Sequence, residues 1–251
     1  MELLIVAAAS LLAGLVDSIV GGGGLVLVPA LFAAYPAAAP ATLFGTNKSG
    51  AVWGTGIATW QYGRRVRLRW PVLLPAALAA LIGAFLGAWA VTRIDPGFLR
   101  RLLPVVLLAV LLYTLARKDL GRTHAPRHAP GRETLLACAI ALAVGGYDGF
   151  FGPGTGSFFI FLFVRVLGYD FLNASASAKL LNVSTNLAAL ALFAATGHVW
   201  WRIGLVIAAA NVAGSLIGAR LALRHGAGFV RVVFIAVVAA LIVKTGYDAF
   251  F

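Results

Sequence analysis

Two lysines stand inside apolar stretches of the chain, where an ammonium group is costly and therefore informative. Lys48 lies in ATLFGTNKSGAVWGTGIATW, and Lys179 lies in LNASASAKLLNVSTNLAALALF. If each stretch is a membrane-spanning helix, each ammonium group lies roughly 10 Å inside the hydrocarbon boundary, where it costs about 2.5–3.5 kcal/mol. We expect both lysines to face a cavity or a partner, and such a pair suits a small anion. The alternative is that each side chain extends to the nearby interface.

Polar residues accompany both lysines. Around Lys179, the spacings of Ser175, Asn182 and Asn186 place all four side chains on one helical face. The residues that accompany Lys48 are Asn47, Ser49 and Thr55. The two stretches thus share the lysine but differ in their hydrogen-bonding groups, which suits an asymmetric ligand. For any one of these polar residues, hydrogen bonding between helices explains the pattern equally well.

A glycine cluster follows each of two aspartates by about one turn. Asp17 precedes Gly21 to Gly24, and Asp148 precedes GPGTG at residues 152–156. Such clusters unwind a helix, and the free N–H groups of the next half-helix attract anions. The alternative is that the glycines only permit close packing. The backbone candidates for an anion site are Gly22, Gly23, Gly24, Gly154, Thr155 and Gly156.

The two aspartates have three possible roles beside these clusters. They could be counter-ions of the lysines, helix caps, or carriers of a coupled proton. We favour a counter-ion or cap for Asp17 and Asp148.

The composition excludes a soluble domain and predicts an all-α polytopic membrane protein. Of 251 residues, 61% are hydrophobic and 11% are charged, and the mean hydropathy is +0.96. The net charge of +12 comes from arginines in short segments between apolar ones, which predicts a topology signal and no nucleic-acid partner. Trp70, Trp200, Trp201 and Tyr62 fit an aromatic belt.

Ten apolar segments divide the chain, and two of them, 24–35 and 156–168, are too short to span a bilayer. We expect these two to be broken or re-entrant half-helices. The ten segments are 3–20, 24–35, 41–61, 70–92, 98–116, 133–151, 156–168, 172–196, 202–224 and 229–250.

A shift of 131 residues superimposes the two halves of the chain without a gap. It aligns Asp17 with Asp148, Gly21 with Gly152, Lys48 with Lys179, Trp70 with Trp201, and Gly83 and Gly87 with Gly214 and Gly218. The sequence therefore predicts two tandem repeats, each with four or five helical segments, in residues 1–117 and 133–251. Residues 118–132 form a basic cytoplasmic linker between them.

The orientation of the two repeats follows weakly from their charges. Inverted copies place more of the Lys and Arg residues in the cytoplasm than parallel copies do, so we favour inversion. The loops Arg64 to Arg69 and Arg117 to Arg132 then lie inside and both termini lie outside.

Motifs for enzymes and cofactors are missing or incomplete. The run GTNKS at residues 45–49 resembles the end of a phosphate loop, but Asn47 replaces the required glycine. The four histidines lack the spacing of metal ligands, and the single Cys138 excludes an internal disulfide. We expect no cofactor, no metal and no enzymatic activity, and no oligomeric state is specified by the pattern.

Two blocks of sequence carry a family resemblance. DSIVGGGGLVLVPAL followed by GTNKSGAVWGT, and YDGFFGPGTGSF followed by AKLLNVSTNLAAL, resemble the sulfite exporter TauE/SafE family of membrane transporters. The resemblance covers nearly the whole chain. It implies transport of sulfite, sulfonates such as sulfoacetate, or related anions across the bacterial inner membrane.

Together these patterns predict a secondary transporter for a small anion, most plausibly sulfite or an organosulfonate, working by alternating access in the lipid bilayer. Lys48 and Lys179 would frame one site, with Asn47, Thr55, Asn182 and Asn186 selecting among anions. An anion channel is the alternative, and a membrane-embedded enzyme is disfavoured by the missing nucleophile pairs.

Overall fold

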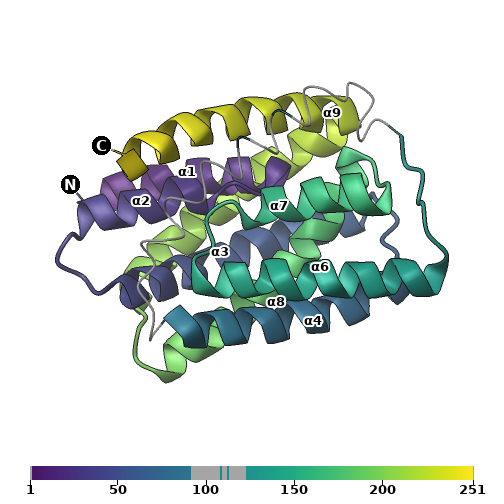
Figure 1. Ribbon diagram of the computed structural model, residues 1–251. Coiled ribbons are helices and arrows are strands. Elements are labelled where there is room, and N and C mark those ends of the chain that lie inside the picture. The colour runs from purple at the N-terminus through teal and green to yellow at the C-terminus, as the bar shows by residue number, and fades with distance from the viewer. Residues whose placement is uncertain (1, 92–107, 109–111, 113–122, 251) are drawn as a thin grey trace.

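The computed structural model describes residues 2–91, 108, 112 and 123–250, and every regular element among them is a helix (Figure 1). Most of the expected apolar segment 98–116 lies outside the described residues. The helices are α1 (Glu2–Val20), α2 (Gly24–Ala34), α3 (Pro40–Gly63), α4 (Trp70–Val91), α6 (Pro130–Phe150), α7 (Thr155–Leu162), the π-helix η1 (Phe163–Leu167), α8 (Phe171–Ala195) and α9 (Trp201–Phe250).

Five of the described helices are long and apolar enough to cross a membrane, namely α1, α4, α6, α8 and the Trp201–Val237 part of α9. α3 has sufficient length, with 24 residues, but carries many polar side chains. These side chains, including Thr46, Asn47 and Lys48, are buried among the other helices. The prediction of an all-helical membrane protein is therefore confirmed.

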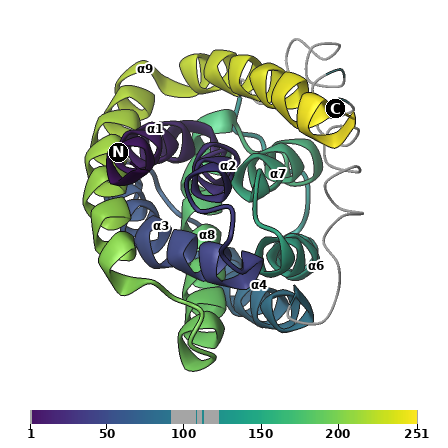
Figure 2. The ribbon, with the colours of Figure 1, turned by 90° about the vertical axis from the view of Figure 1, so that its left-hand side faces the viewer.

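The last two apolar segments of the sequence, 202–224 and 229–250, are two stretches of α9. They meet at Gly226, whose φ of 74° and ψ of −167° are not helical. Figures 1 and 2 show the chain changing direction there, so that the second stretch folds back across the bundle. A positive φ costs a glycine little, which explains why the break falls at this residue.

The basic linker also ends earlier than residue 132, because α6 begins at Pro130. A proline in the first helical turn already has the required φ and lacks only an N–H that the turn leaves unbonded. Residues 123–129, directly before it, are exposed except for the half-buried His128, yet they bond to the chain at the end of η1. Ala125 N donates to Gly168 O, and Arg127 N donates to Leu167 O.

The short helices α2 and α7 each form a hairpin with the helix before them. After α1, Gly21 adopts a φ of 77°, and Gly23 lies against α1, so that a Cβ there would be 2.6 Å from Ala13 O. After α6, Gly152 adopts a φ of 89°. Both turns therefore require glycine, and α2 packs back along α1.

The tips of the two hairpins meet inside the molecule. Ser157 N donates to Gly21 O at 3.2 Å, and Ser157 Oγ donates to Val20 O at 3.0 Å. The backbones are so close that a side chain on Gly21 would overlap Gly156. The glycine clusters therefore serve close packing as well as the turns.

Glycines also join the long helices in two equivalent pairs. A Cβ on Gly83 or Gly87 of α4 would overlap the carbonyl oxygens of Leu142 and Gly146 in α6. Gly214 and Gly218 of α9 approach Leu11 and Leu15 of α1 in the same way. The small residue at every fourth position lets the backbones touch, as is common between membrane helices. Each pair joins helices from different halves of the chain.

These contacts also fix the directions of the helices. The residue numbers at the contacts increase together in α4 and α6, and again in α1 and α9, so each pair is parallel. α3 is parallel to the start of α9, because Gly45 lies beside His198 and Gly54 lies beside Asn211. Figure 1 shows the result: α1 and α6 run in opposite directions.

We expect Gly83→Ala to reduce the stability of the folded protein, because the added methyl group would separate α4 from α6. Overpacking of this kind costs about 1–3 kcal/mol. Gly56→Ala is the control, since a Cβ there meets nothing within 4 Å. Alanine should leave the melting temperature at that position unchanged or raise it. Thermal unfolding of both variants in detergent checks this, and equal melting temperatures would contradict the packing argument.

Candidate functional site

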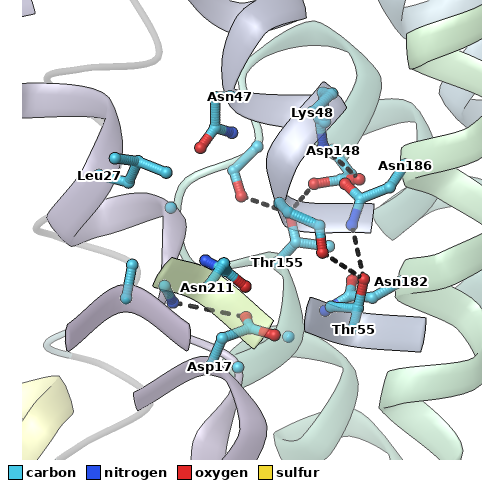
Figure 3. A pocket seen from close by; sticks show the side chains of 17 residues that line it. Asp17, Leu27, Asn47, Lys48, Thr55, Asp148, Thr155, Asn182, Asn186 and Asn211 are labelled. Atoms are coloured by element: carbon cyan, nitrogen blue, oxygen red, sulfur yellow. Dashed lines mark hydrogen bonds and ion pairs between the residues drawn. The ribbon is translucent and has the colours of Figure 1, made fainter. Parts of the chain in front are cut away.

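A small internal cavity lies where the hairpin tips meet α3, α8 and α9 (Figure 3). Its volume is about 40 Å³, and both halves of the chain contribute to its wall. Of the residues that the sequence singled out, the cavity is lined by Asp17, Gly23, Gly24, Asn47, Lys48, Thr55, Asp148, Thr155, Gly156, Asn182 and Asn186. Lys179, Gly22 and Gly154 lie outside the lining.

Lys48 and Asp148 form a buried ion pair on the cavity wall. Lys48 Nζ in α3 lies 2.7 Å from Asp148 Oδ2, and the other carboxylate oxygen, Oδ1, accepts from Thr155 Oγ1 at 2.8 Å. Both charged side chains are about 5% exposed. Asp148 belongs to the last turn of α6, where the partial negative charge of the helix also favours a cation.

Lys179 makes the equivalent pair with Asp17, in a different way. Its side chain is fully buried and donates to the backbone oxygen of Asp17, while Nζ lies 3.5 Å from Asp17 Oδ2. Asp17 belongs to the last turn of α1, and its carboxylate lines the cavity. Lys179 therefore lies behind Asp17, and Lys48 is the lysine that reaches the cavity.

The two ion pairs are exchanged between the halves of the chain. Lys48 of the first half pairs with Asp148 of the second, and Lys179 of the second half pairs with Asp17 of the first. The four charges sum to zero. Removing one partner of such a buried pair costs about 3–5 kcal/mol, because the other charge is left without compensation. The pairs therefore hold the halves together as well as lining the site.

Amide groups complete the wall of the cavity. Asn186 Nδ2 donates to Thr55 Oγ1 at 3.3 Å, and these two residues occupy equivalent positions in the halves. The Oδ1 atom of Asn182 is buried without a hydrogen-bond partner among the described residues. Buried polar atoms are normally bonded, so this unsatisfied acceptor marks a place where a water or a hydrogen-bond donor of a ligand can bind.

Asn211 of α9 also lines the cavity, and reasoning from the sequence missed it. It is 4% exposed, and its Nδ2 donates to Ser10 O in α1 at 3.3 Å. Its counterpart in the first half is Ala80, so the comparison of the two halves did not draw attention to it. Asn211 and Ser215, four residues apart in an apolar stretch, were the signal that could have found it.

Two other polar residues have structural contacts. Ser175 lies on the polar face of Lys179, but its Oγ donates to Ile19 O at 2.7 Å and does not line the cavity. Tyr62 was expected in an aromatic belt, and that expectation is wrong. It is fully buried, and its hydroxyl donates to Ser18 O at 2.9 Å, because the end of α3 packs inside the bundle.

A further buried carboxylate, that of Glu133, joins the N-terminal ends of α4 and α6. Glu133 is fully buried, 3.0 Å from the Arg69 guanidinium, and it accepts from the Tyr169 hydroxyl at 2.7 Å. Burial raises the pKa of the Tyr169 phenol above its ordinary value, and the bond to Glu133 acts in the same direction. This network lies away from the cavity and keeps the helices in register.

The described residues contain no group of three or more His, Cys, Asp or Glu side chains arranged to hold a metal ion. The charged groups at the cavity are the Lys48 ammonium and the carboxylates of Asp17 and Asp148. An ammonium group that already binds one carboxylate can bind another oxyanion in its place, so the arrangement is suited to anion recognition.

Known proteins resemble this chain over nearly its whole length. The model of the family described as sulfite exporter TauE/SafE matches residues 6–245. The chain is 36% identical over 237 residues to the probable membrane transporter protein ORF9 of Sinorhizobium sp., covering 94% of this chain and 89% of that protein. It is 36% identical over 240 residues to the probable membrane transporter protein YfcA of Escherichia coli, covering 96% of this chain and 88% of that protein.

A probable membrane transporter protein of Haemophilus influenzae is 33% identical over 240 residues, with 94% of this chain and 91% of that protein covered. No solved structure matches the chain. The family match spans the hairpins, the cavity and both ion pairs. The chain therefore belongs to the sulfite exporter TauE/SafE family of membrane transporters.

Proposed function

We propose that the protein is a secondary transporter that carries a small oxyanion, sulfite or an organosulfonate, across the bacterial inner membrane by alternating access. The observation that carries the proposal is the Lys48 ammonium, buried inside the bundle at the wall of a cavity that both halves share. A membrane protein keeps such a costly cation only where it has a partner or a function. The family and the bacterial relatives support membrane transport, which is the coarser part of this proposal.

The cavity suits a small anion. Its volume of about 40 Å³ is room for about three water molecules, which is close to the size of an ion with a few heavy atoms. The anion would replace Asp148 Oδ2 on the Lys48 ammonium. Asn47, Asn182, Asn186 and Thr55 would then select among anions through their hydrogen bonds.

The glycine tips would contribute backbone groups. Gly23, Gly24 and Gly156 line the cavity without side chains of their own, so an anion can approach the main chain there. α2 and α7 begin at these tips, and the start of a helix carries partial positive charge. Gly22 and Gly154 would act by shaping the tips.

The proposal includes two inverted repeats, residues 1–117 and 133–251, joined by a cytoplasmic linker. Three pairs of helices begin 131 residues apart: α2 and α7, α3 and α8, and α4 and α9. The opposite directions of α1 and α6 support inversion. Inverted repeats are common among secondary transporters, whose sites lie between the two copies.

The two ion pairs suggest how access alternates. In the described conformation, the Lys48 pair reaches the cavity while Lys179 is closed off behind Asp17. If the two repeats exchange conformations, Lys179 becomes the lysine that meets the anion from the other side of the membrane. Both lysines then belong to one transport site, used in turn as one repeat moves against the other.

We expect the anion to stabilise the purified protein, and Lys48→Ala to abolish this effect while the protein stays folded. Saturating ligand, at about 100 times its Kd, adds about 2.7 kcal/mol. A screen of melting temperatures against sulfite, thiosulfate, sulfate, sulfonates and carboxylates measures this. Arg202→Ala is the control, an exposed cation outside the cavity. The same ligand shift in Lys48→Ala and wild type would reject the site.

We also expect transport in liposomes to saturate and to show counterflow, because a carrier must bind its anion before changing conformation. Lys179→Ala should lose counterflow although Lys179 does not line the described cavity. Radiolabelled sulfite uptake measures both properties. Flux that rises linearly with concentration and shows no counterflow would instead identify an anion channel.

A further inference from the structure

The charge balance of the core constrains what can accompany an anion. Lys48, Lys179, Asp17 and Asp148 together carry no net charge in their ordinary ionised states. An anion that binds Lys48 takes the place of Asp148 Oδ2, which lies 2.7 Å from the ammonium nitrogen, and leaves that carboxylate without its hydrogen bond to Lys48. Two negative groups would then compete for one cation inside the bundle, where solvent screening is weak. A compensating positive charge has to enter with the anion.

The groups around Asp148 determine where that charge can go. α3 supplies Lys48, α1 supplies Asp17 across the cavity, and α8 supplies Lys179 behind Asp17. On α6 itself, the Tyr147 hydroxyl donates its hydrogen bond to Pro153 O. The described residues of α4 and α7 have no titratable side chain, and Arg165 of η1 is exposed. Asp148 is therefore the carboxylate that an anion on Lys48 would meet.

The hydrogen bonds of Thr155 can accommodate both charge states of Asp148. Thr155 Oγ1 lies 2.8 Å from Asp148 Oδ1 and 2.6 Å from Gly152 O. When the carboxylate is ionised, the hydroxyl donates its proton to Oδ1. When Asp148 carries a proton on Oδ1, this O–H group donates to Thr155 Oγ1. The Thr155 hydroxyl then donates its own hydrogen to Gly152 O. In both states Asp148 Oδ1 and the Thr155 hydroxyl are hydrogen-bonded without movement of the main chain.

We propose that Asp148 takes up a proton when the anion binds, so that one proton is carried with each anion. This inference rests on the proposed function. The proton adds to Asp148, Lys48 remains an ammonium group, and its hydrogen bond passes from Asp148 Oδ2 to the anion. The core returns to its original net charge when both leave.

The test is the pH dependence of anion binding, followed by thermal shift in detergent between about pH 5 and pH 8. Methanesulfonate is the probe, because its own charge does not change in this range. Binding one proton with the anion tightens the apparent Kd about tenfold for each unit of decrease in pH. We expect this slope in wild type and its loss in Asp148→Asn. Asp170→Asn is the matched control and should keep the slope, because Asp170 lies at the start of α8, away from the cavity.

The outcomes separate the two proposals. Binding of methanesulfonate with no pH dependence in wild type overturns proton coupling and leaves the anion site standing. A slope that persists in folded Asp148→Asn overturns the assignment to Asp148. If Asp148→Asn does not fold, a transport assay with the wild-type protein in liposomes decides the coupling. The assay measures whether a pH gradient, imposed at zero membrane potential, drives uptake of methanesulfonate. If none of the screened anions binds at any pH, the proposed function itself fails.

A separate basic cavity lies at the end of the molecule where α3 ends. Its volume is about 570 Å³, and it is lined by Trp60, Gln61, Arg64, Arg65, Arg220, Leu223 and Arg224. Arg64 and Arg65 directly follow the end of α3, and Arg220 and Arg224 belong to α9, so the four exposed arginines come from different halves of the chain. No acidic residue is part of the lining. The Arg64 guanidinium also lies over the Trp60 ring at 5.0 Å.

Three of the four arginines have no basic counterpart in the other half of the chain. The residues 131 positions away from Arg64, Arg65 and Arg220 are Ala195, Thr196 and Trp89. Arg224 corresponds to Arg93, so it is Arg64, Arg65 and Arg220 that the duplicated pattern does not require. Gln61 adds a buried amide to the wall, and its Oε1 has no hydrogen-bond partner among the described residues.

The geometry points to the headgroup of an anionic phospholipid as the ligand of this basic cavity. Guanidinium groups bind phosphate through paired hydrogen bonds, and basic pockets at the ends of membrane helices suit such headgroups. Trp60, 57% exposed, and Leu223 provide apolar surface for the attached chains. A soluble anion has no apolar chains that could pack on that surface.

We expect phosphatidylglycerol added to detergent micelles to raise the melting temperature, and phosphatidylcholine to have no such effect. The double variant Arg64→Gln/Arg224→Gln should lose this shift. Arg67→Gln is the control at the same end, an exposed arginine outside the cavity. An equal shift with glycerol phosphate would identify a soluble phosphate as the ligand and overturn the lipid proposal. A shift that survives in the double variant, or that is absent in wild type, overturns it too.

Discussion

The structure depends on the compensation of two lysines buried inside the helix bundle, away from bulk water. Each ammonium group is neutralised by an aspartate from the other half of the chain, in the last turn of a helix whose carbonyl end also favours a cation. This constraint brings the tips of the two hairpins together inside the bundle. It also explains why the halves interlock: neither half contains the partner that its own lysine needs.

Close backbone packing makes that arrangement geometrically attainable. Gly21 and Gly156 let the two hairpin tips touch, and the glycines of α4 and α9 let each of these helices lie against the hairpin of the other half. Since lipid tails are as apolar as leucine, contact of this kind is a main source of attraction between membrane helices. Among the described residues, this packing leaves a small polar cavity that is lined by charged groups and by the unsatisfied amide of Asn182.

Much of the fold followed from local patterns. The apolar segments, the glycine clusters and the lysine positions predicted long helices, two short ones and a polar interior, because each depends on residues close in sequence. The site followed less completely. Lys179 lies behind Asp17, and Tyr62 is buried inside the bundle. Asn211 lines the cavity from α9, although the equivalent position in the first half carries no polar residue. In each case the outcome depends on which side chain occupies a position on another helix.

The sequence by itself determined that the chain crosses a membrane, that its halves correspond, and that two costly cations lie at depth. Composition, spacing and the energy of transfer to lipid are sufficient for those conclusions. Only the tertiary structure decided which carboxylate serves which lysine, since Lys48 and Asp148 are 100 residues apart and Lys179 and Asp17 are 162 apart. Electrostatic pairing acts over a few ångströms, so it is fixed only when packing brings distant segments together.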